Sequence, residues 1–265
     1  MAIFPVTQTG AEGVAMKAGA TNTIVILGAT SALAQSLADQ LAAEKNSLVL
    51  LARNNTELER IKADLTIRHA VQVHTQVCDL LNIGDAMTLA EKVESSVGPV
   101  QGFIAVAGDM GDLSDQTQQH NIEQVTAVNY TATASITAAF AKRMQGRKEG
   151  IIVMISSVAG DRGRPNNFVY GAAKSALNSF ASGLRASLHK DGVHVLTVKP
   201  GPMDTPMTAG MKSPLIYPRG KAAKAIIKAM KKKCNVAYVP WFWWIIMNII
   251  KHIPEGIFKK LNLKA

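Results

Sequence analysis

Two hydrophobic periods alternate along the chain from Thr23 onward. Short runs rich in β-branched residues predict buried strands, and the segments between them repeat apolar residues every three to four positions, as helices do. The expected strands cover 23–27, 47–52, 71–77, 102–107, 150–156, 193–198 and 236–239. The expected helices cover 32–44, 56–69, 82–96, 116–145, 168–190 and 218–233. This alternation predicts an α/β fold: one doubly wound domain whose seven-stranded parallel sheet is covered on both faces.

The two ends of the chain depart from this pattern. Residues 1–22 are rich in Gly, Ala and Thr and lack the basic start and long apolar run of a signal peptide, so we expect a loosely ordered extension. Residues 23–240 are expected to form the sheet domain. Residues 241–265 form a short apolar and basic C-terminal extension, whose ten-residue run 241–250 is well below the ~18 residues of a membrane-spanning helix.

Composition narrows the classes of function. The chain of 265 residues is 48% hydrophobic and 18% charged, which excludes a disordered protein. Two cysteines and six scattered histidines exclude a disulfide framework and leave no metal site to expect. Most of the net charge of +10 comes from residues 221–265, which hold ten lysines, one acidic residue and all three tryptophans. That mixture is more typical of a membrane-surface patch than of a nucleic-acid groove.

The turn after the first expected strand has features of a phosphate-binding site. Ligands of doubly wound sheets bind at the carboxyl ends of the strands. Gly28 permits a tight turn, Thr30 or Ser31 can cap the next helix, and the amino end of that helix attracts phosphate. Ala32 and Ala34 stand where a dinucleotide fingerprint has glycine. An ordinary strand-to-helix turn is therefore an equal alternative at this point.

The residues after the second and third expected strands bear on which nucleotide would bind. An acidic residue after the second strand would bond a ribose 2′-hydroxyl and repel a 2′-phosphate. This chain has Ala52 and Arg53 there, which favours a phosphorylated ribose, although a solvated surface arginine is the alternative. Asp79 can accept a hydrogen bond from an adenine amino group, or only cap the helix expected near Asn82.

Three residues form the candidate catalytic set. Ser157 follows the strand expected at 150–156, Tyr170 lies thirteen residues later, and Lys174 comes one helical turn after Tyr170. A tyrosine, with its pKa near ~10, becomes an acid–base at neutral pH when a nearby ammonium stabilises its phenolate. Ser157 can donate a hydrogen bond to a carbonyl oxygen and orient the carbonyl for hydride attack.

With these residues the chain resembles the short-chain dehydrogenase/reductase superfamily over residues 23–240. The resemblance implies a Rossmann-type fold, a nicotinamide cofactor, and a homodimer or homotetramer. It implies the catalytic residues Ser157, Tyr170, Lys174 and Asn129, the last within VNYTA. In the family this asparagine holds a water of the proton relay.

The same resemblance implies a set of cofactor-binding positions. Pro200-Gly201 and Thr205 match the family's PGxxxT element, in which Thr205 and the backbone at Met203 hold the nicotinamide carboxamide. The other implied positions are Gly28, Thr30, Ser31, Ala32, Leu33, Arg53, Asp79, Leu80, Ala107, Gly108, Tyr170 and Lys174. The chain reads Ala105-Val106-Ala107-Gly108 where the family usually has Asn-Asn-Ala-Gly.

Three segments resemble one branch of the superfamily more closely: AGDRGRPNNFVYGAAK (159–174), PGPMDTPMT (200–208) and IIKHIPEGIFKKL (249–261). That branch reduces a polyprenylphosphoryl 2-keto-pentose, decaprenylphosphoryl-2-keto-ribose, to the arabinose epimer. The resemblance implies an NAD(P)-dependent reductase of a lipid-linked keto-sugar, and Arg53 favours NADP(H) over NAD(H). The alternatives are a reductase of another lipophilic ketone, steroid-, retinoid- or acyl-like, and a dinucleotide-binding sensor without catalysis.

Two interpretations of the C-terminal extension remain open, and they can overlap. In one, the apolar run 241–250 folds back over the substrate pocket or a subunit interface, and the lysines are merely solvated. In the other, its aromatic face enters the headgroup region and the lysines meet anionic lipid. The second predicts a cytoplasmic protein bound peripherally to the inner face of the membrane, with no nucleic-acid partner.

Overall fold

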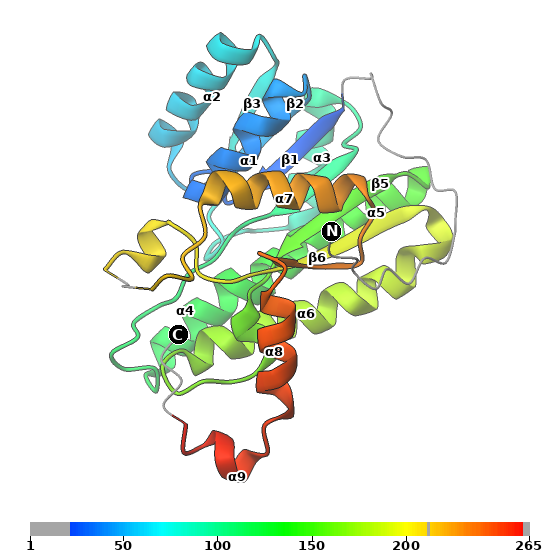
Figure 1. The fold of residues 1–265 in the computed structure, drawn as a ribbon. Helices are drawn as coiled ribbons and strands as arrows, with labels where there is room; N and C mark the ends of the chain where they lie inside the picture. The colour runs from blue at the N-terminus through cyan, green and yellow to red at the C-terminus, as the bar shows by residue number, and fades with distance from the viewer. Residues whose placement is uncertain (1–21, 211–212, 262–265) are drawn as a thin grey trace.

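Seven parallel strands form the central sheet of the computed structural model, which describes residues 22–210 and 213–261 (Figure 1). Their order across the sheet is β3-β2-β1-β4-β5-β6-β7. The strands are β1 (Thr23–Leu27), β2 (Ser47–Ala52), β3 (Val73–Val77), β4 (Gly102–Ala105), β5 (Gly150–Ile155), β6 (Val193–Pro200) and β7 (Val236–Val239). The doubly wound, seven-stranded parallel sheet predicted from the hydrophobic pattern is confirmed.

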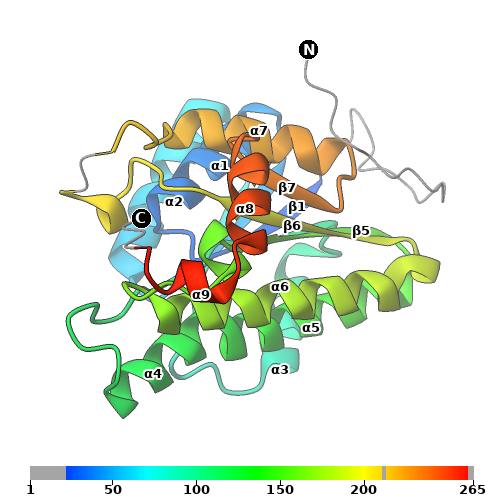
Figure 2. The same ribbon diagram turned by 60° about the horizontal axis from the view of Figure 1, so that its bottom comes forward.

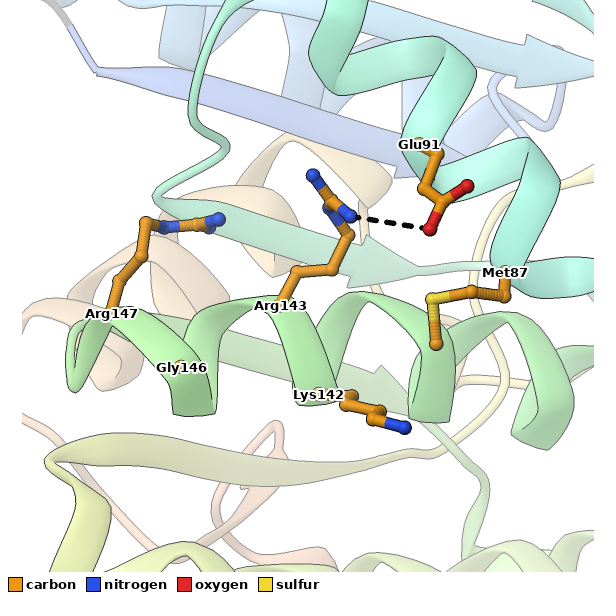
Figure 3. Close-up of a pocket in the computed structure, with 6 residues that line it drawn as sticks. All are labelled: Met87, Glu91, Lys142, Arg143, Gly146 and Arg147. Atoms are coloured by element: carbon orange, nitrogen blue, oxygen red, sulfur yellow. Dashed lines mark ion pairs between the residues drawn. The ribbon is translucent and has the colours of Figure 1, made fainter.

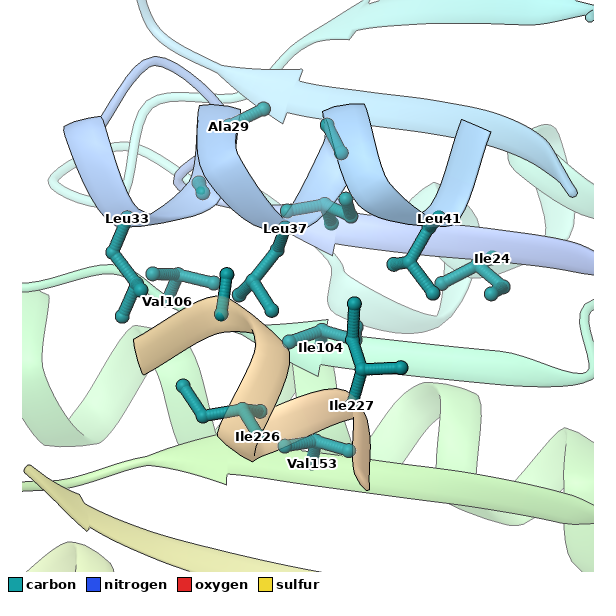
Figure 4. Packing of buried hydrophobic residues seen from close by; sticks show 14 of the residues in the cluster. Ile24, Ala29, Leu33, Leu37, Leu41, Ile104, Val106, Val153, Ile226 and Ile227 are labelled. Atoms are coloured by element: carbon teal, nitrogen blue, oxygen red, sulfur yellow. The ribbon is translucent and has the colours of Figure 1, made fainter. Parts of the chain in front are cut away.

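Helices cover both faces of this sheet. One face is covered by α1 (Ala32–Ala43), α2 (Asn55–His69) and α7 (Arg219–Lys231), and the other by α3 (Ala86–Val97), α5 (Ala132–Arg147) and α6 (Phe168–Leu188). Alternate residues of a strand point to opposite faces. In β1, Ile26 lies in register with Leu50 and Ile104 and packs toward α1 and α7, while its neighbours Val25 and Leu27 pack toward α5. Figure 4 shows the first of these cores between α1, α7 and the sheet.

The helix predicted over 116–145 is interrupted. It consists of α4 (Gln119–Thr126) and α5, joined by a π-helical turn, η1 (Ala127–Thr131). The hydrophobic period did not reveal this turn, because it covers only five residues and helix continues on both sides of it. Single π turns of this kind occur frequently at functional sites.

The start of α3 differs from the prediction as well. The helix begins at Ala86 rather than near Asn82, because Asp85 caps it by accepting a hydrogen bond from the Thr88 N–H at 2.8 Å. Asp79 is not the cap of this helix: its carboxylate accepts from the Leu81 N–H at 3.1 Å within the preceding turn. The capping alternative for Asp79 is therefore wrong.

The sheet order reverses between β1 and β4, and the carboxyl ends of these two strands enclose the turn at Gly28. The Gly28 N–H donates to the Leu51 carbonyl at 2.8 Å, and its φ of +79° lies in the region that favours glycine. A Cβ there would lie 2.8 Å from the Ala107 nitrogen. The backbones of the two strands thus meet too closely for any side chain at this position.

The C-terminal extension packs against the domain. It contains the helices α8 (Trp243–His252) and α9 (Glu255–Phe258), which Figures 1 and 2 draw in red, and α8 contacts β7 and the short helix Val158–Asp161. Trp243 and Met247 of α8 are buried in one cluster with Val158 and Tyr238. None of the helices in the described ranges is long and apolar enough to cross a membrane. Residues 1–21 of the predicted N-terminal extension lie outside the described residues.

Arg162 fastens this extension to the segment that follows Ser157. Its Nη1 donates to the Ile250 and Ile253 carbonyls, each at 2.6 Å, at the carboxyl end of α8. Its Nη2 lies 2.9 Å from the Glu255 carboxylate of α9, and its guanidinium lies 3.7 Å from the Phe258 ring centroid. One side chain therefore holds the ends of both tail helices.

Candidate active site

Lys174 lies buried between α6 and the carboxyl ends of two strands. Its side chain is 2% exposed, and Nζ donates to the Ala107 carbonyl at 3.3 Å and the Ile155 carbonyl at 3.2 Å. Burial penalises the ammonium and lowers the pKa of Lys174 to about 8. The two carbonyl oxygens offset part of this penalty, and they fix the ammonium where β4 and β5 end.

Tyr170 lies one turn earlier on the same face of α6. Its side chain is buried, and the Lys174 Nζ is 5.6 Å from the centroid of its ring. Burial raises the pKa of Tyr170 to about 12, although a hydrogen bond with the Ser157 side chain acts in the opposite direction. The sequence suggested an ammonium-stabilised phenolate. In the structure burial is the larger influence on the pKa of Tyr170 and favours the protonated phenol, and stabilisation of the phenolate by Lys174 stays a prediction.

Two glycines let η2 (Val158–Asp161) approach α6 closely enough to bring these groups together. A Cβ at Gly160 would lie 2.7 Å from the Lys174 carbonyl carbon, and one at Gly171 would lie 3.0 Å from a backbone oxygen of η2. Ser156 adds a hydrogen bond from Oγ to the Lys174 carbonyl at 3.1 Å. Sequence reasoning missed these three residues. The glycine beside Tyr170 and the one between Ser157 and Tyr170 were the available signal.

Asn129 joins the same site from the π turn η1. The side chain is fully buried, and its Nδ2 donates to the Asp109 carbonyl at 2.6 Å and the Val125 carbonyl at 2.8 Å. Gly108 stands between Asn129 and Lys174: a Cβ there would lie 3.4 Å from Asn129 Oδ1 and 3.6 Å from Lys174 Nζ. The four residues predicted to be catalytic therefore converge at the ends of β4 and β5. The water-holding role of Asn129 stays a prediction.

The turn between β1 and α1 fits a bound dinucleotide. Ser31, rather than Thr30, caps α1 by accepting a hydrogen bond from the Ala34 N–H at 3.3 Å. Gly28 has no side chain to block a ligand, and the backbone N–H groups at the amino end of α1 can donate to a pyrophosphate. Arg53 is exposed at the end of β2 and bonds to no other residue within the described ranges. Its guanidinium is thus available to an anionic ligand.

The segment after β6 has a packing role that the sequence did not reveal. The Thr205 N–H donates to the Met203 carbonyl at 2.8 Å, and Met203 pairs with Tyr217 in an isolated β-bridge. A Cβ at Gly201 would overlap the Trp243 indole of α8. Glycine is therefore required at 201 by the docked tail. The predicted nicotinamide contacts of this segment stay predictions.

A shallow depression of about 460 Å³ between α3 and α5 lies away from these residues (Figure 3). It is lined by Met87, Glu91, Lys142, Arg143, Gly146 and Arg147. Arg147 donates to the Val100 carbonyl just before β4 and pairs with the buried Glu94 at 2.9 Å. The depression thus adjoins the amino ends of the strands, opposite the end where ligands of such sheets bind.

Comparison with known proteins gives consistent results. The profile of the short chain dehydrogenase family matches residues 22–215. An uncharacterized oxidoreductase of Mycobacterium tuberculosis is 31% identical over 240 residues, which cover 90% of this chain and 96% of that protein. A short-chain dehydrogenase from Sphingobium yanoikuyae in complex with NADPH superposes with a TM-score of 0.75 at 24% identity, over 92% of this chain and 98% of that one. A bulky-bulky ketone specific alcohol dehydrogenase from Comamonas testosteroni superposes with a TM-score of 0.77 at 23% identity, over 92% of this chain and 96% of that one.

The buried ammonium predicts a pH-dependent stability. The pKa of Lys174 is about 8 in the fold and near ~10.4 in an unfolded chain. The unfolded chain therefore binds the extra proton between these values, and stability rises with pH across that window. Relative to Lys174→Met, the wild-type free energy of unfolding should increase by roughly 2–3 kcal/mol from pH 7.5 to 10. Urea titrations measure it, with Lys92→Met on the surface of α3 as control. Parallel pH profiles for wild type and Lys174→Met would contradict the burial of a charged Lys174.

Proposed function

The chain belongs to the short chain dehydrogenase family, and on this premise we propose that it is an NAD(P)-dependent reductase that converts a ketone to a secondary alcohol. The observation that carries the proposal is the buried, protonated Tyr170 next to Ser157 and Lys174. A proton donor and a hydrogen-bond donor that meet at one point suit a carbonyl oxygen that gains negative charge.

Each side chain has a distinct role in this reaction. A bound nicotinamide supplies the hydride. Tyr170 donates its phenolic proton to the carbonyl oxygen, and the raised pKa of Tyr170 keeps that proton in place at neutral pH. Ser157 orients the oxygen through its hydroxyl. Lys174 places a positive charge 5.6 Å from the ring centroid, which stabilises the phenolate left after the proton is transferred.

NADP(H) is the cofactor we propose. The Gly28 turn and the amino end of α1 supply the pyrophosphate site. Arg53 stands at the end of β2, where a ribose 2′-substituent would lie, and within the described ranges it has no carboxylate partner to neutralise it.

A lipid-linked keto-sugar at an anionic membrane surface is the substrate that the extension supports best. While one face of α8 packs on the domain, the opposite face leaves Trp244 46% and Ile249 63% exposed. Other exposed apolar side chains nearby on the extension are Trp241, Ile245 and Ile257, and the exposed lysines are Lys251, Lys259 and Lys260. An apolar, aromatic and basic surface of this kind suits the headgroup region of the cytoplasmic leaflet. The two interpretations of the tail are therefore compatible, because one helix both packs and presents a free face.

Tyr170→Phe tests the chemistry. The variant loses only a hydroxyl, so its fold and NADPH affinity should persist, while turnover should fall by roughly 100- to 10,000-fold. Loss of NADPH absorbance with a panel of simple and lipid-linked ketones measures turnover, and cofactor fluorescence measures binding. Turnover close to wild type in this variant would be incompatible with Tyr170 as the acid.

Arg53→Ala tests the cofactor. Loss of a charge-assisted hydrogen bond to the 2′-phosphate should raise the KM for NADPH about tenfold or more, with little change for NADH. Arg60→Ala serves as the control, since Arg60 lies on the following helix, α2, and already pairs with Glu57 at 2.7 Å. Equal losses for both cofactors would show that Arg53 does not contact the 2′-phosphate.

The membrane surface is tested by replacing Trp244, Ile245 and Ile249 together with serine. These side chains are exposed, so the thermal midpoint should hold, whereas binding to phosphatidylglycerol vesicles should fall at least tenfold. Deletion of the whole extension is unsuitable because it would also remove the buried Trp243. Ile67→Ser, an exposed apolar residue on α2, is the matched control. Unchanged vesicle binding by the triple variant would exclude this face as the membrane contact.

A further inference from the structure

Arg164 is a buried cation with no carboxylate partner among the described residues. It is 6% exposed, and the one hydrogen-bond contact of its side chain in the described ranges runs from Nη2 to the Met247 sulfur at 3.3 Å. Its Nε is buried without a partner. Guanidinium remains charged in proteins, and burial of an unpaired charge costs free energy. A fold that keeps such a charge has a use for it beyond packing.

The charges around Arg164 do not balance it. Asp161 is the carboxylate close enough to favour its charged form. Both oxygens of Asp161 are already engaged, one by Lys199 Nζ at 2.5 Å and the other by the Tyr238 hydroxyl at 2.6 Å. The buried Arg164 and the partly buried Lys199 therefore share the one carboxylate of Asp161, and these three side chains keep a net positive charge.

Arg162 shows what a structural arginine looks like in the same loop. Two residues before Arg164, it donates to the Ile250 and Ile253 carbonyls and pairs with Glu255. Its nitrogens are used to hold the tail. Arg164 makes no comparable contact, although it lies against the same helix.

A second buried donor without a partner lies on the face of α8 that Arg164 contacts. The Trp243 Nε1–H is buried and unpaired, and Trp243 lies one turn before Met247 on the packed face of α8. Met247 is the residue that Arg164 touches. Two buried donors therefore flank one methionine, at the junction of α8, the Gly201 turn and the loop between Ser157 and Tyr170. Both need an acceptor, and at least one needs a negative charge.

We propose that Arg164 and the Trp243 indole N–H bind a phosphate-type oxyanion carried by the substrate. The guanidinium fork matches two oxygens of a phosphate, and the indole suits a third. Trp243 and Met247 pack against Val158, the residue next to Ser157. They belong to α8, whose outer face is apolar. A phosphodiester that joins a keto-sugar to a lipid would pass through this junction with the ketone at Tyr170. This substrate assignment rests on the proposed function, whereas the anion site does not.

The first experiment measures thermal midpoints of wild type and Arg164→Met with NADPH present, in phosphate and in chloride of equal ionic strength. If burial of the Arg164 charge costs folding free energy and serves ligand binding, Arg164→Met melts at the wild-type temperature or above in chloride. Phosphate then raises the midpoint of the wild type but not that of Arg164→Met. Lys224→Met, an exposed charge on α7, should respond to phosphate as wild type does. A lower midpoint for Arg164→Met together with equal phosphate stabilisation of both proteins would overturn the anion site.

The second experiment compares a short-prenyl ketose phosphodiester with its uncharged ether analogue. The ratio of their kcat/KM values should fall about tenfold to a hundredfold in Arg164→Met and hold in Lys224→Met. An unchanged ratio with Arg164-dependent phosphate stabilisation would overturn the substrate assignment and leave a site for free phosphate. Failure of the wild type to reduce either ketone would refute the proposed function, while the midpoints would still decide the anion site.

Discussion

The site is built around one buried ammonium. The Lys174 ammonium can be buried away from water because it donates hydrogen bonds to the carbonyls of Ala107 and Ile155, where β4 and β5 end. Those carbonyls are in place because the two strands are paired in register and reach the same edge of the sheet. Gly108 and Gly160 then let backbone approach the lysine from two sides. A side chain at Gly160 would collide with the Lys174 backbone and push α6 away from η2.

The same burial decides the protonation state of the neighbouring tyrosine. Water would stabilise a phenolate at Tyr170, and α6, η2 and the strand ends exclude it. The phenol therefore keeps its proton even with a cation 5.6 Å from its ring. Burial thus shifts both Tyr170 and Lys174 toward their neutral forms. A substrate in this site must supply a polar acceptor, such as a carbonyl oxygen, for the Tyr170 hydroxyl.

Sequence patterns predicted the sheet and the proximity of Tyr170 and Lys174 because both depend on local periods. Strand alternation and one-turn helical spacing operate over a few residues, and they placed Tyr170 and Lys174 on one face of α6. The π turn at Asn129 could not be foreseen, since it results from the Asn129 amide bonding to Asp109 across the β4 loop. The tail shows the same limit. Trp243 and Trp244 are adjacent and chemically alike, and only the tertiary contact at Gly201 decides that one is buried and the other exposed.

The loop between Ser157 and Tyr170 links the chemistry to the tail, because Arg162 and Arg164 both contact α8 from it. The proposed roles of these residues all depend on hydride transfer to a ketone bound at Tyr170. The most direct measurement supplies NADPH deuterated at the transferable position of the nicotinamide and examines the alcohol product by NMR. The account predicts one deuterium on the carbinol carbon of the product and a slower reaction with the labelled cofactor. Oxidation of the labelled cofactor with no deuterium at that carbon would contradict it.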